Sequence, residues 1–197
     1  MAKAYQGHQA GVTALCNSSN DNYLFTGGQD AKVRSWDQRQ AKQVATFREH
    51  TDTINSIRQS PDGKWIASGS SDGSLKIWDL RNNRLIENFE IPNQKVTTIE
   101  FNPMTLTLAN GSTDRTIKYW DLENFQSITQ TRADSSPITH LHFSEHNPDH
   151  LFSVCKENLR VWNIETNRLL DNISMPPKAV ADLGITFVKN FLLLACI

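Results

Sequence analysis

The sequence predicts an all-β fold that is built from tandem copies of one small sheet. Three observations support this prediction. Tryptophan followed by Asp or Asn recurs every 42 residues, at Trp36, Trp78, Trp120 and Trp162. Short runs rich in β-branched and aromatic residues alternate with turn residues, such as those at 60–63. Helical periodicity does not extend beyond a few residues anywhere in the chain.

The 42-residue register extends beyond the tryptophans. Two apolar columns share it, with Val12, Ile54, Val96 and Ile138 in the first and Leu15, Ile57, Ile99 and Leu141 in the second. We therefore expect four repeats, at 7–48, 49–90, 91–132 and 133–174. Each repeat should hold four short strands, which in the second repeat fall near 54–59, 64–69, 74–79 and 84–89.

A period of about 40–45 residues with Trp-Asp pairs is typical of WD repeats, and essentially the whole chain resembles that family. The resemblance implies a WD-repeat β-propeller, in which four-stranded antiparallel blades surround a central channel. In the family, a His, a Ser or Thr, an Asp and the Trp of one blade form a hydrogen-bonded network. The matching residues are His8, Thr26, Asp30 and Trp36 in the first repeat and His50, Ser68, Asp72 and Trp78 in the second.

The network pattern is incomplete in the later repeats. The third repeat keeps Asp114 and Trp120, and the fourth keeps Trp162 but has Glu157 nearest to the position of the turn Asp. A buried polar group without a partner costs stability. We therefore expect the third and fourth blades to be looser than the first two, or held by packing alone.

The repeats do not add up to a closed ring. Residues 2–6 align with the last strand of a preceding repeat, and a half-blade at 175–197 holds two expected strands, at 179–185 and 191–197. Members of the family usually close the ring with seven blades, whereas this chain supplies about four and a half. We expect 1–197 to form a partial propeller, an open arc with exposed edges. The chain would then be a fragment or short gene product, or would need another chain for closure; a small self-contained ring is the alternative.

Composition and charge name no particular partner. The 197 residues carry a net charge of −1, so neither nucleic acid nor a membrane is an expected partner. The cysteines Cys16, Cys155 and Cys196 form no C-x-x-C pair, which is typical of a reducing compartment. No signal peptide is apparent, and the longest apolar run is too short to span a bilayer. We expect a cytoplasmic protein without a cofactor.

Two patterns that resemble active sites have simpler explanations. A histidine cluster could suggest a metal site, but its members occupy variable columns or a polar loop, and we expect solvated or half-buried side chains: His140, His142, His146 and His150. His8, Thr26 and Asp30 resemble a catalytic triad, but the same trio recurs in the second repeat, which indicates a scaffold. We expect no catalytic residue and no metal. Gly27 and Gly111 are interpreted as the ends of second strands that enter a tight turn.

The resemblance also suggests where partners bind. In the family, contact positions are the residue before the turn Asp and the residues that flank the first apolar residue of the first strand. By this rule the partner-binding face consists of Gln29, Thr53, Asn55, Ser71, Lys95, Thr97, Thr113 and Thr139.

The second half of the chain resembles one branch of the family. The segment 110–126, the short turn at 156–162 and the segment 178–183 are similar to late repeats of the WD-repeat regulatory subunit of katanin, the microtubule-severing ATPase. The resemblance implies a non-catalytic scaffold at the microtubule cytoskeleton or centrosome, with the separate katanin ATPase subunit or tubulin as partners. The helical C-terminal domain that binds the ATPase in that family is absent here, which argues against ATPase binding.

A different class of adaptor is the main alternative. WD repeats with the same motifs also serve as ubiquitin-ligase receptors and transcription corepressors. The motifs that separate these classes from the katanin subunit are few in this sequence, so both hypotheses stay open at this point.

Overall fold

Four antiparallel four-stranded sheets make up most of the structure. The computed structural model describes residues 4–131, 134–144, 147–156 and 158–174, together with the backbone of 183–188 and 191–196. The first blade comprises β1 (Val12–Asn17), β2 (Tyr23–Gly28), β3 (Val33–Asp37) and β4 (Lys42–Phe47). The second comprises β5 (Ile54–Gln59), β6 (Trp65–Ser70), β7 (Ser74–Asp79) and β8 (Arg84–Glu90). No helix that could cross a bilayer occurs within these ranges.

The other two blades follow the same order. The third comprises β9 (Val96–Phe101), β10 (Thr107–Ser112), β11 (Ile117–Asp121) and β12 (Gln126–Gln130). The fourth comprises β13 (His140–Phe143), β14 (His150–Val154), β15 (Asn158–Asn163) and β16 (Arg168–Ser174). A separate two-stranded sheet, β17 (Leu183–Val188) and β18 (Phe191–Cys196), comes last.

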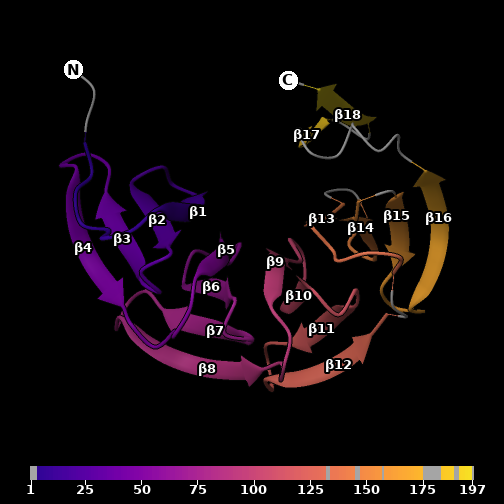
Figure 1. The fold of residues 1–197 in the computed structure, drawn as a ribbon, viewed down its shortest axis with the longest axis horizontal. Coiled ribbons are helices and arrows are strands. Elements are labelled where there is room, and N and C mark those ends of the chain that lie inside the picture. Colours follow the sequence, from indigo (N-terminus) through magenta and orange to yellow (C-terminus); the bar gives the residue numbers. More distant parts are fainter. Residues whose placement is uncertain are drawn as a thin grey trace.

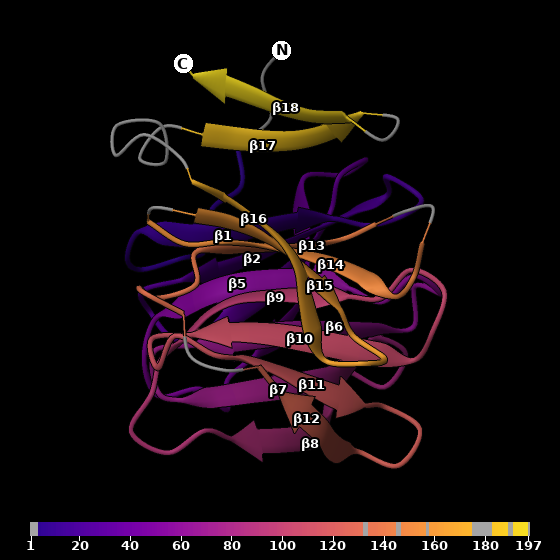
Figure 2. The ribbon, with the colours of Figure 1, turned by 90° about the vertical axis from the view of Figure 1, so that its right-hand side faces the viewer.

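The blades stand side by side in an open arc (Figure 1). Their first strands line the inner side of the arc and their fourth strands the outer side. Figure 2 shows the β17–β18 hairpin at the end of the arc, beyond the fourth blade. Because strands alternate in direction, the loops before the first strand and after the second share one face, which we call the upper face. The all-β, open-arc propeller is thus confirmed.

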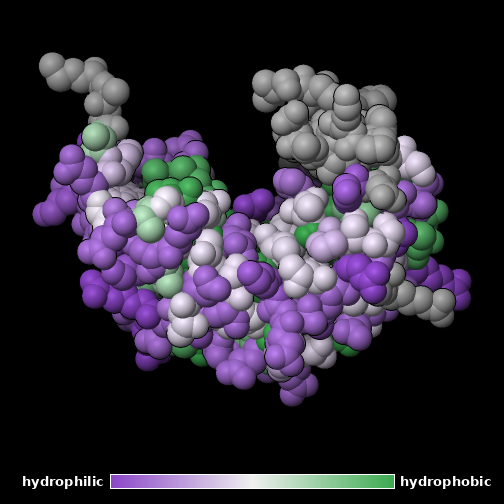
Figure 3. All heavy atoms as spheres, in the orientation of Figure 1, coloured by the Kyte–Doolittle hydropathy of each residue, from purple (hydrophilic) through white to green (hydrophobic). Residues whose placement is uncertain are grey.

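The open arc leaves apolar surface on the first blade uncovered. Ile54 and Ile57 of β5 are fully buried, but Val12 and Leu15 at the same positions of β1 are 54% and 58% exposed. The difference arises because the first blade covers β5, whereas no blade precedes β1 among the described residues. Figure 3 shows a largely hydrophilic face with a hydrophobic patch over the β1 region.

Two predicted segments differ from the structure at the ends of the arc. Residues 4–6 are not in a strand, because no neighbouring strand pairs with them, yet Tyr5 packs on Trp36 at a centroid distance of 5.6 Å. Phe47, which occupies the same repeat position as Tyr5, packs on Trp78 with a distance of 5.1 Å between the ring centroids. For the predicted strand at 179–185, the described β17 spans Leu183–Val188 and so ends beyond the predicted position; 175–182 lie outside the described residues.

The hydrophobic core consists of three clusters that lie between successive blades. The cluster between the first and second blades joins residues of β1–β4 to Ile54, Ile57, Ile66 and Trp78. Equivalent clusters join the second blade to the third and the third to the fourth. Trp120, for example, stacks on Phe89 of the preceding blade at 4.3 Å. Each blade therefore buries its faces only against its neighbours.

Three glycines allow this close approach. A Cβ atom built on Gly27, Gly69 or Gly111 would lie within 2.6 Å of an Ile or Val side chain of the next blade, namely Ile54 and Val96 at the starts of β5 and β9 and Ile138 just before β13. Gly27 and Gly111 lie at the ends of β2 and β10, as predicted, but the turns that follow are not what requires a glycine there. None of the three has a positive φ angle, and the packing between blades is what requires them.

Replacing Gly69 by Ala should destabilise the protein without changing its fold. The new Cβ would lie 2.4 Å from Val96 Cγ1, and overpacking of this kind costs about 2 kcal/mol. Gly11→Ala is the control, because there the nearest atom is the Gln29 side chain at 3.3 Å, which can move. Urea denaturation should show the loss for G69A and a change within about 0.5 kcal/mol for G11A. Equal stabilities would contradict the packing role.

Candidate functional site

A chain of hydrogen bonds runs through each of the first two blades. The Trp36 indole nitrogen lies 2.8 Å from Thr26 Oγ1, which lies 2.8 Å from His8 Nε2. His8 Nδ1 in turn lies 2.9 Å from Asp30. An indole N–H can only donate. A carboxylate can only accept, so the Nδ1–H of His8 donates to Asp30, and an imidazole whose only proton is on Nδ1 accepts at Nε2 from the Thr26 hydroxyl.

The second blade repeats this chain with Trp78, Ser68, His50 and Asp72, at 2.8, 2.8 and 2.9 Å. Both ring nitrogens of each histidine are engaged within the blade. The backbone N–H groups of Gln9 and Thr51 also donate to the two aspartates. The networks therefore hold the loop before the first strand against the turn after the second, and they position the upper face.

The third and fourth blades contain shorter polar contacts. Trp120 donates to Asn110 at 2.7 Å and Trp162 donates to Ser153 at 2.8 Å. Asp114 is bound by Lys118 at 2.7 Å instead of by a histidine. The prediction that these blades are held by packing alone was wrong, because charged and amide side chains replace the missing histidine. Glu157 lies outside the described residues.

Sequence reasoning missed a basic residue two positions before each Trp. Its signal was present in the sequence as a fourth column with the same period, namely Arg34, Lys76, Lys118 and Arg160. In the first, third and fourth blades this residue forms an ion pair with an aspartate, namely Asp30 at 3.3 Å, Asp114 at 2.7 Å and Asp134 at 3.0 Å, respectively.

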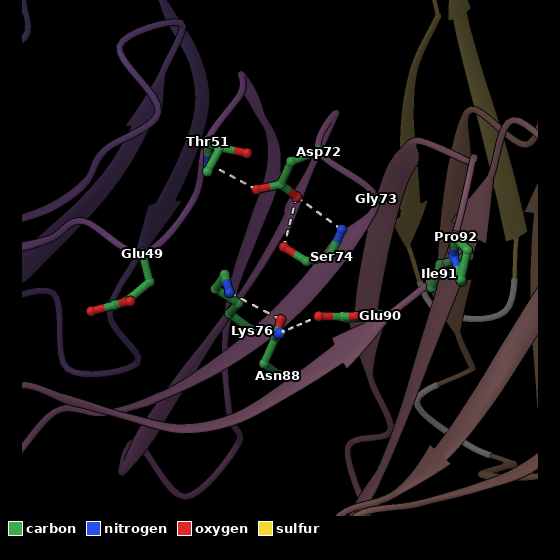
Figure 4. Close-up of a pocket in the computed structure, with 10 residues that line it drawn as sticks. All are labelled: Glu49, Thr51, Asp72, Gly73, Ser74, Lys76, Asn88, Glu90, Ile91 and Pro92. Carbon is green, nitrogen blue, oxygen red and sulfur yellow. Dashed lines mark hydrogen bonds between the residues drawn. The ribbon is translucent and has the colours of Figure 1, made fainter.

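The second blade departs from this arrangement. Lys76 is buried, and its ammonium donates to Asn88 at 3.0 Å, because His50, Ser74 and Thr51 already bind Asp72. Figure 4 shows Lys76, Asn88 and Asp72 among the residues that line a polar recess of about 350 Å³. The recess opens beside the loop before β5, at the rim of the upper face.

The predicted partner-binding residues all lie at the upper ends of the blades but differ in exposure. Gln29, Lys95 and Thr139 are exposed, and the others are half-buried: Thr53, Asn55, Ser71, Thr97 and Thr113. Asn55 and Thr97 donate to the backbone carbonyls of Val96 and Ile138 in the next blade. These two side chains therefore join neighbouring blades. Thr13, which is not among the predicted partner-binding residues, likewise donates to the backbone carbonyl of Ile54 in the next blade.

Charged side chains also join the inner strands. Arg58 of β5 lies 2.6 Å from Glu100 of β9, and His142 of β13 lies 3.5 Å from the same carboxylate. The three positions share one column of the repeat, so a chain of polar contacts crosses three blades on the channel side.

The histidine cluster is dispersed in the structure. His140 is exposed at the channel side, where desolvation and the nearby Arg58 lower its pKa. His142 faces Glu100, and His150 contacts Asn147 within its own loop. Across the described ranges, no group of three or more His, Cys, Asp or Glu side chains could hold a metal ion; His146 lies outside those ranges.

The turn aspartates are kept ionised by their partners. For Asp114, burial raises the pKa, but hydrogen bonds from Lys118, Ser112 and Thr116 outweigh it and lower the pKa from 3.8 to about 2. For Asp72, burial is likewise outweighed by hydrogen bonds from His50 and Ser74, and its pKa also falls below the usual range.

Asp114 should contribute to the loss of stability in acid. A carboxylate whose pKa is lowered by folding stabilises the protein above its unfolded pKa, and this contribution is lost as the pH falls through the folded value. The stability that ionised Asp114 contributes should therefore be lost as the pH falls from about 4 to about 2. Thermal melts across this pH range should show a smaller decrease for Asp114→Asn than for wild type. Asp21→Asn, in an exposed turn, should follow wild type; an unchanged slope for D114N would refute the assignment.

Comparisons with known proteins agree with this architecture. The family described as "WD domain, G-beta repeat" matches residues 2–37, 41–79 and 84–121, together more than half of the chain. A guanine nucleotide-binding protein subunit beta from Oryza sativa subsp. japonica is 46% identical over 54 residues, which cover 26% of this chain and 14% of that protein. The solved structure of U3-55K superposes with a TM-score of 0.77 at 21% identity, over 84% of this chain and 52% of the other.

The match to U3-55K concerns the fold alone, and this chain spans only part of both relatives. The family match, by contrast, covers three of the four blades, with their Trp-Asp pairs. The chain therefore belongs to the WD domain, G-beta repeat family.

Proposed function

We propose that this chain is a non-catalytic scaffold that binds other proteins through its upper face. The observation that carries the proposal is the separation of roles among its polar residues. The histidine networks and ion pairs are engaged inside the blades, whereas Gln29, Lys95 and Thr139 remain exposed at the blade ends. Exposed polar side chains of this kind occur at the rims of protein–protein interfaces.

The trio that resembles a catalytic triad supports the same proposal. The imidazole of His8 is held between Thr26 and Asp30, and the Thr26 hydroxyl also accepts the Trp36 indole N–H. A nucleophile needs an approach path for substrate, but Thr26 is buried beneath the blade face. The repetition of the trio in the second blade also favours a structural role.

We further propose that the scaffold targets or regulates microtubule severing in the cytoplasm, at microtubules or the centrosome. The resemblance of segments 110–126 and 156–162 to the katanin regulatory subunit supports this proposal. The alternative is an adaptor of an unrelated complex, such as a ubiquitin ligase or a corepressor. The expected partners differ, so affinity purification distinguishes the two proposals.

The full chain, carrying an affinity tag, should be incubated separately with purified katanin ATPase and with polymerised tubulin. Enrichment of either partner above a tag-only control supports the severing proposal. If neither is retained while components of a ubiquitin ligase or a corepressor co-purify from cells, the adaptor alternative replaces it.

Lys95→Glu should weaken binding of whichever partner the upper face recognises. Lys95 is exposed in the loop before β9, and charge reversal at an interface commonly costs about tenfold or more in affinity. Arg81→Glu is the matched control, since it makes the same charge change at an exposed turn on the opposite face. Binding isotherms and melting curves should show lost affinity only for K95E at unchanged stability. Equal losses for both variants would exclude the upper face as the binding site.

A further inference from the structure

The junctions between successive blades can be compared position by position, because the repeats share one register. On the lower face, opposite the upper face, the turn between the third and fourth strands of the second, third and fourth blades reaches back to the preceding blade. One residue of this turn always has a positive φ angle: Ala41 (52°), Asn83 (51°), Phe125 (55°) and Asn167 (50°). Asparagine suits this conformation, whereas a bulky aromatic residue rarely adopts it.

Phe125 adopts this strained conformation while packing between the second and third blades. Its ring lies 6.1 Å from the Trp65 ring and 6.5 Å from the Phe89 ring. Phe125 and Ile86 of β8 are both partly buried against the core cluster that joins these two blades. Burial of the ring offsets the backbone strain. The phenyl group occupies part of the outer junction, and a cavity of about 170 Å³ that includes Trp65 and Leu122 in its lining remains.

The junction between the first and second blades lacks this ring. Asn83 takes the position of Phe125, Tyr23 that of Trp65 and Val44 that of Ile86. Val44 is 54% exposed, whereas Ile86 is partly buried against its cluster. A cavity of about 220 Å³ lies here. Its apolar lining is formed by Tyr23, Phe25, Val44 and Leu80, and its polar lining by Asn20, Ser35, Gln59, Gly63 and Asn83.

We propose that this cavity, between β4 and the β7–β8 turn, binds the phenyl side chain of a partner polypeptide. The next junction shows that the same backbone framework accommodates a phenyl ring at this position. Size also fits, since a cavity of about 150 Å³ with apolar walls can hold benzene. None of the nine lining residues carries a charge, so the site favours an uncharged ring over an ionic group.

The cavity is independent of the upper face. Its lining comes from the β1–β2 and β3–β4 ends of the first blade and the corresponding ends of the second. A partner bound at the upper face therefore leaves the site accessible. The site can be tested without knowing that partner, and failure of one proposal does not affect the other.

The test uses N-acetyl-phenylalanine amide as the probe and the methyl NMR signals of Val44 and Leu80 as the readout. With the full chain, millimolar probe should produce saturable ring-current shifts at these methyl groups. Asn83→Phe should supply the ring from within the chain and weaken probe binding by about tenfold or more, which corresponds to about 1.4 kcal/mol. Ala41→Phe is the matched control, because it adds the same residue at the same φ angle on a turn with no described blade before it.

A second variant covers the possibility that N83F does not fold. Val44→Glu places a carboxylate on an exposed strand wall of the cavity and should also weaken probe binding by about tenfold. N-acetyl-lysine amide should produce no saturable shift in wild type. The proposal is overturned if wild type shows no saturable shift with the phenylalanine probe. It is also overturned if A41F loses binding as N83F does, or if V44E keeps full affinity.

Discussion

The contact between one blade's second strand and the next blade's first strand is the constraint on which the rest of the structure depends. Gly69 meets Val96 and Gly111 meets Ile138 so closely that a methyl group would not fit. This approach brings the faces of two blades together and allows Trp120 to stack on Phe89. Because each blade buries its faces only against neighbours, stability is shared between blades. The exposed Val12 and Leu15 show the consequence where a neighbour is missing.

Hydrogen bonds between polar side chains inside the blades fix the positions of the loops at the upper ends of the blades. His50 joins the loop before β5 to the turn that carries Asp72. The hydrogen-bonding atoms of the His50 ring and of the Asp72 carboxylate are all engaged within the blade, so neither side chain is available to bind a ligand. Asn55 and Thr97 at the upper face are similarly engaged with the next blade. In the proposed binding mode, recognition by this face therefore depends on the remaining exposed side chains, Gln29, Lys95 and Thr139.

The strands of the blades could be predicted from the sequence, whereas the hydrogen-bond and ion-pair partners of individual side chains could not. Strand positions follow from period and turn residues, so β5 and β7 were predicted to the residue and β6 within one. The alternative partner of Lys76 depends on how many groups already bind Asp72, and spacing does not reveal that number. The end of β17 at Val188 was not predicted, because the half-blade has no complete repeat to set its register. The role of Gly27 required the position of the next blade.

A repeat protein offers an internal comparison that single-copy folds lack. When four turns adopt the same positive φ angle, a difference at that position reflects side-chain packing and not backbone geometry. A positive φ angle strains the backbone more at Phe125 than at Asn83, because asparagine tolerates this conformation better. The conformation persists at Phe125 because its ring packs on Trp65 and Phe89. The shared columns therefore identify the framework, whereas positions at which one blade departs from its column mark where a blade is able to bind something else. By this criterion the recess beside Lys76 and the cavity beside Asn83 are both distinctive features of the second blade.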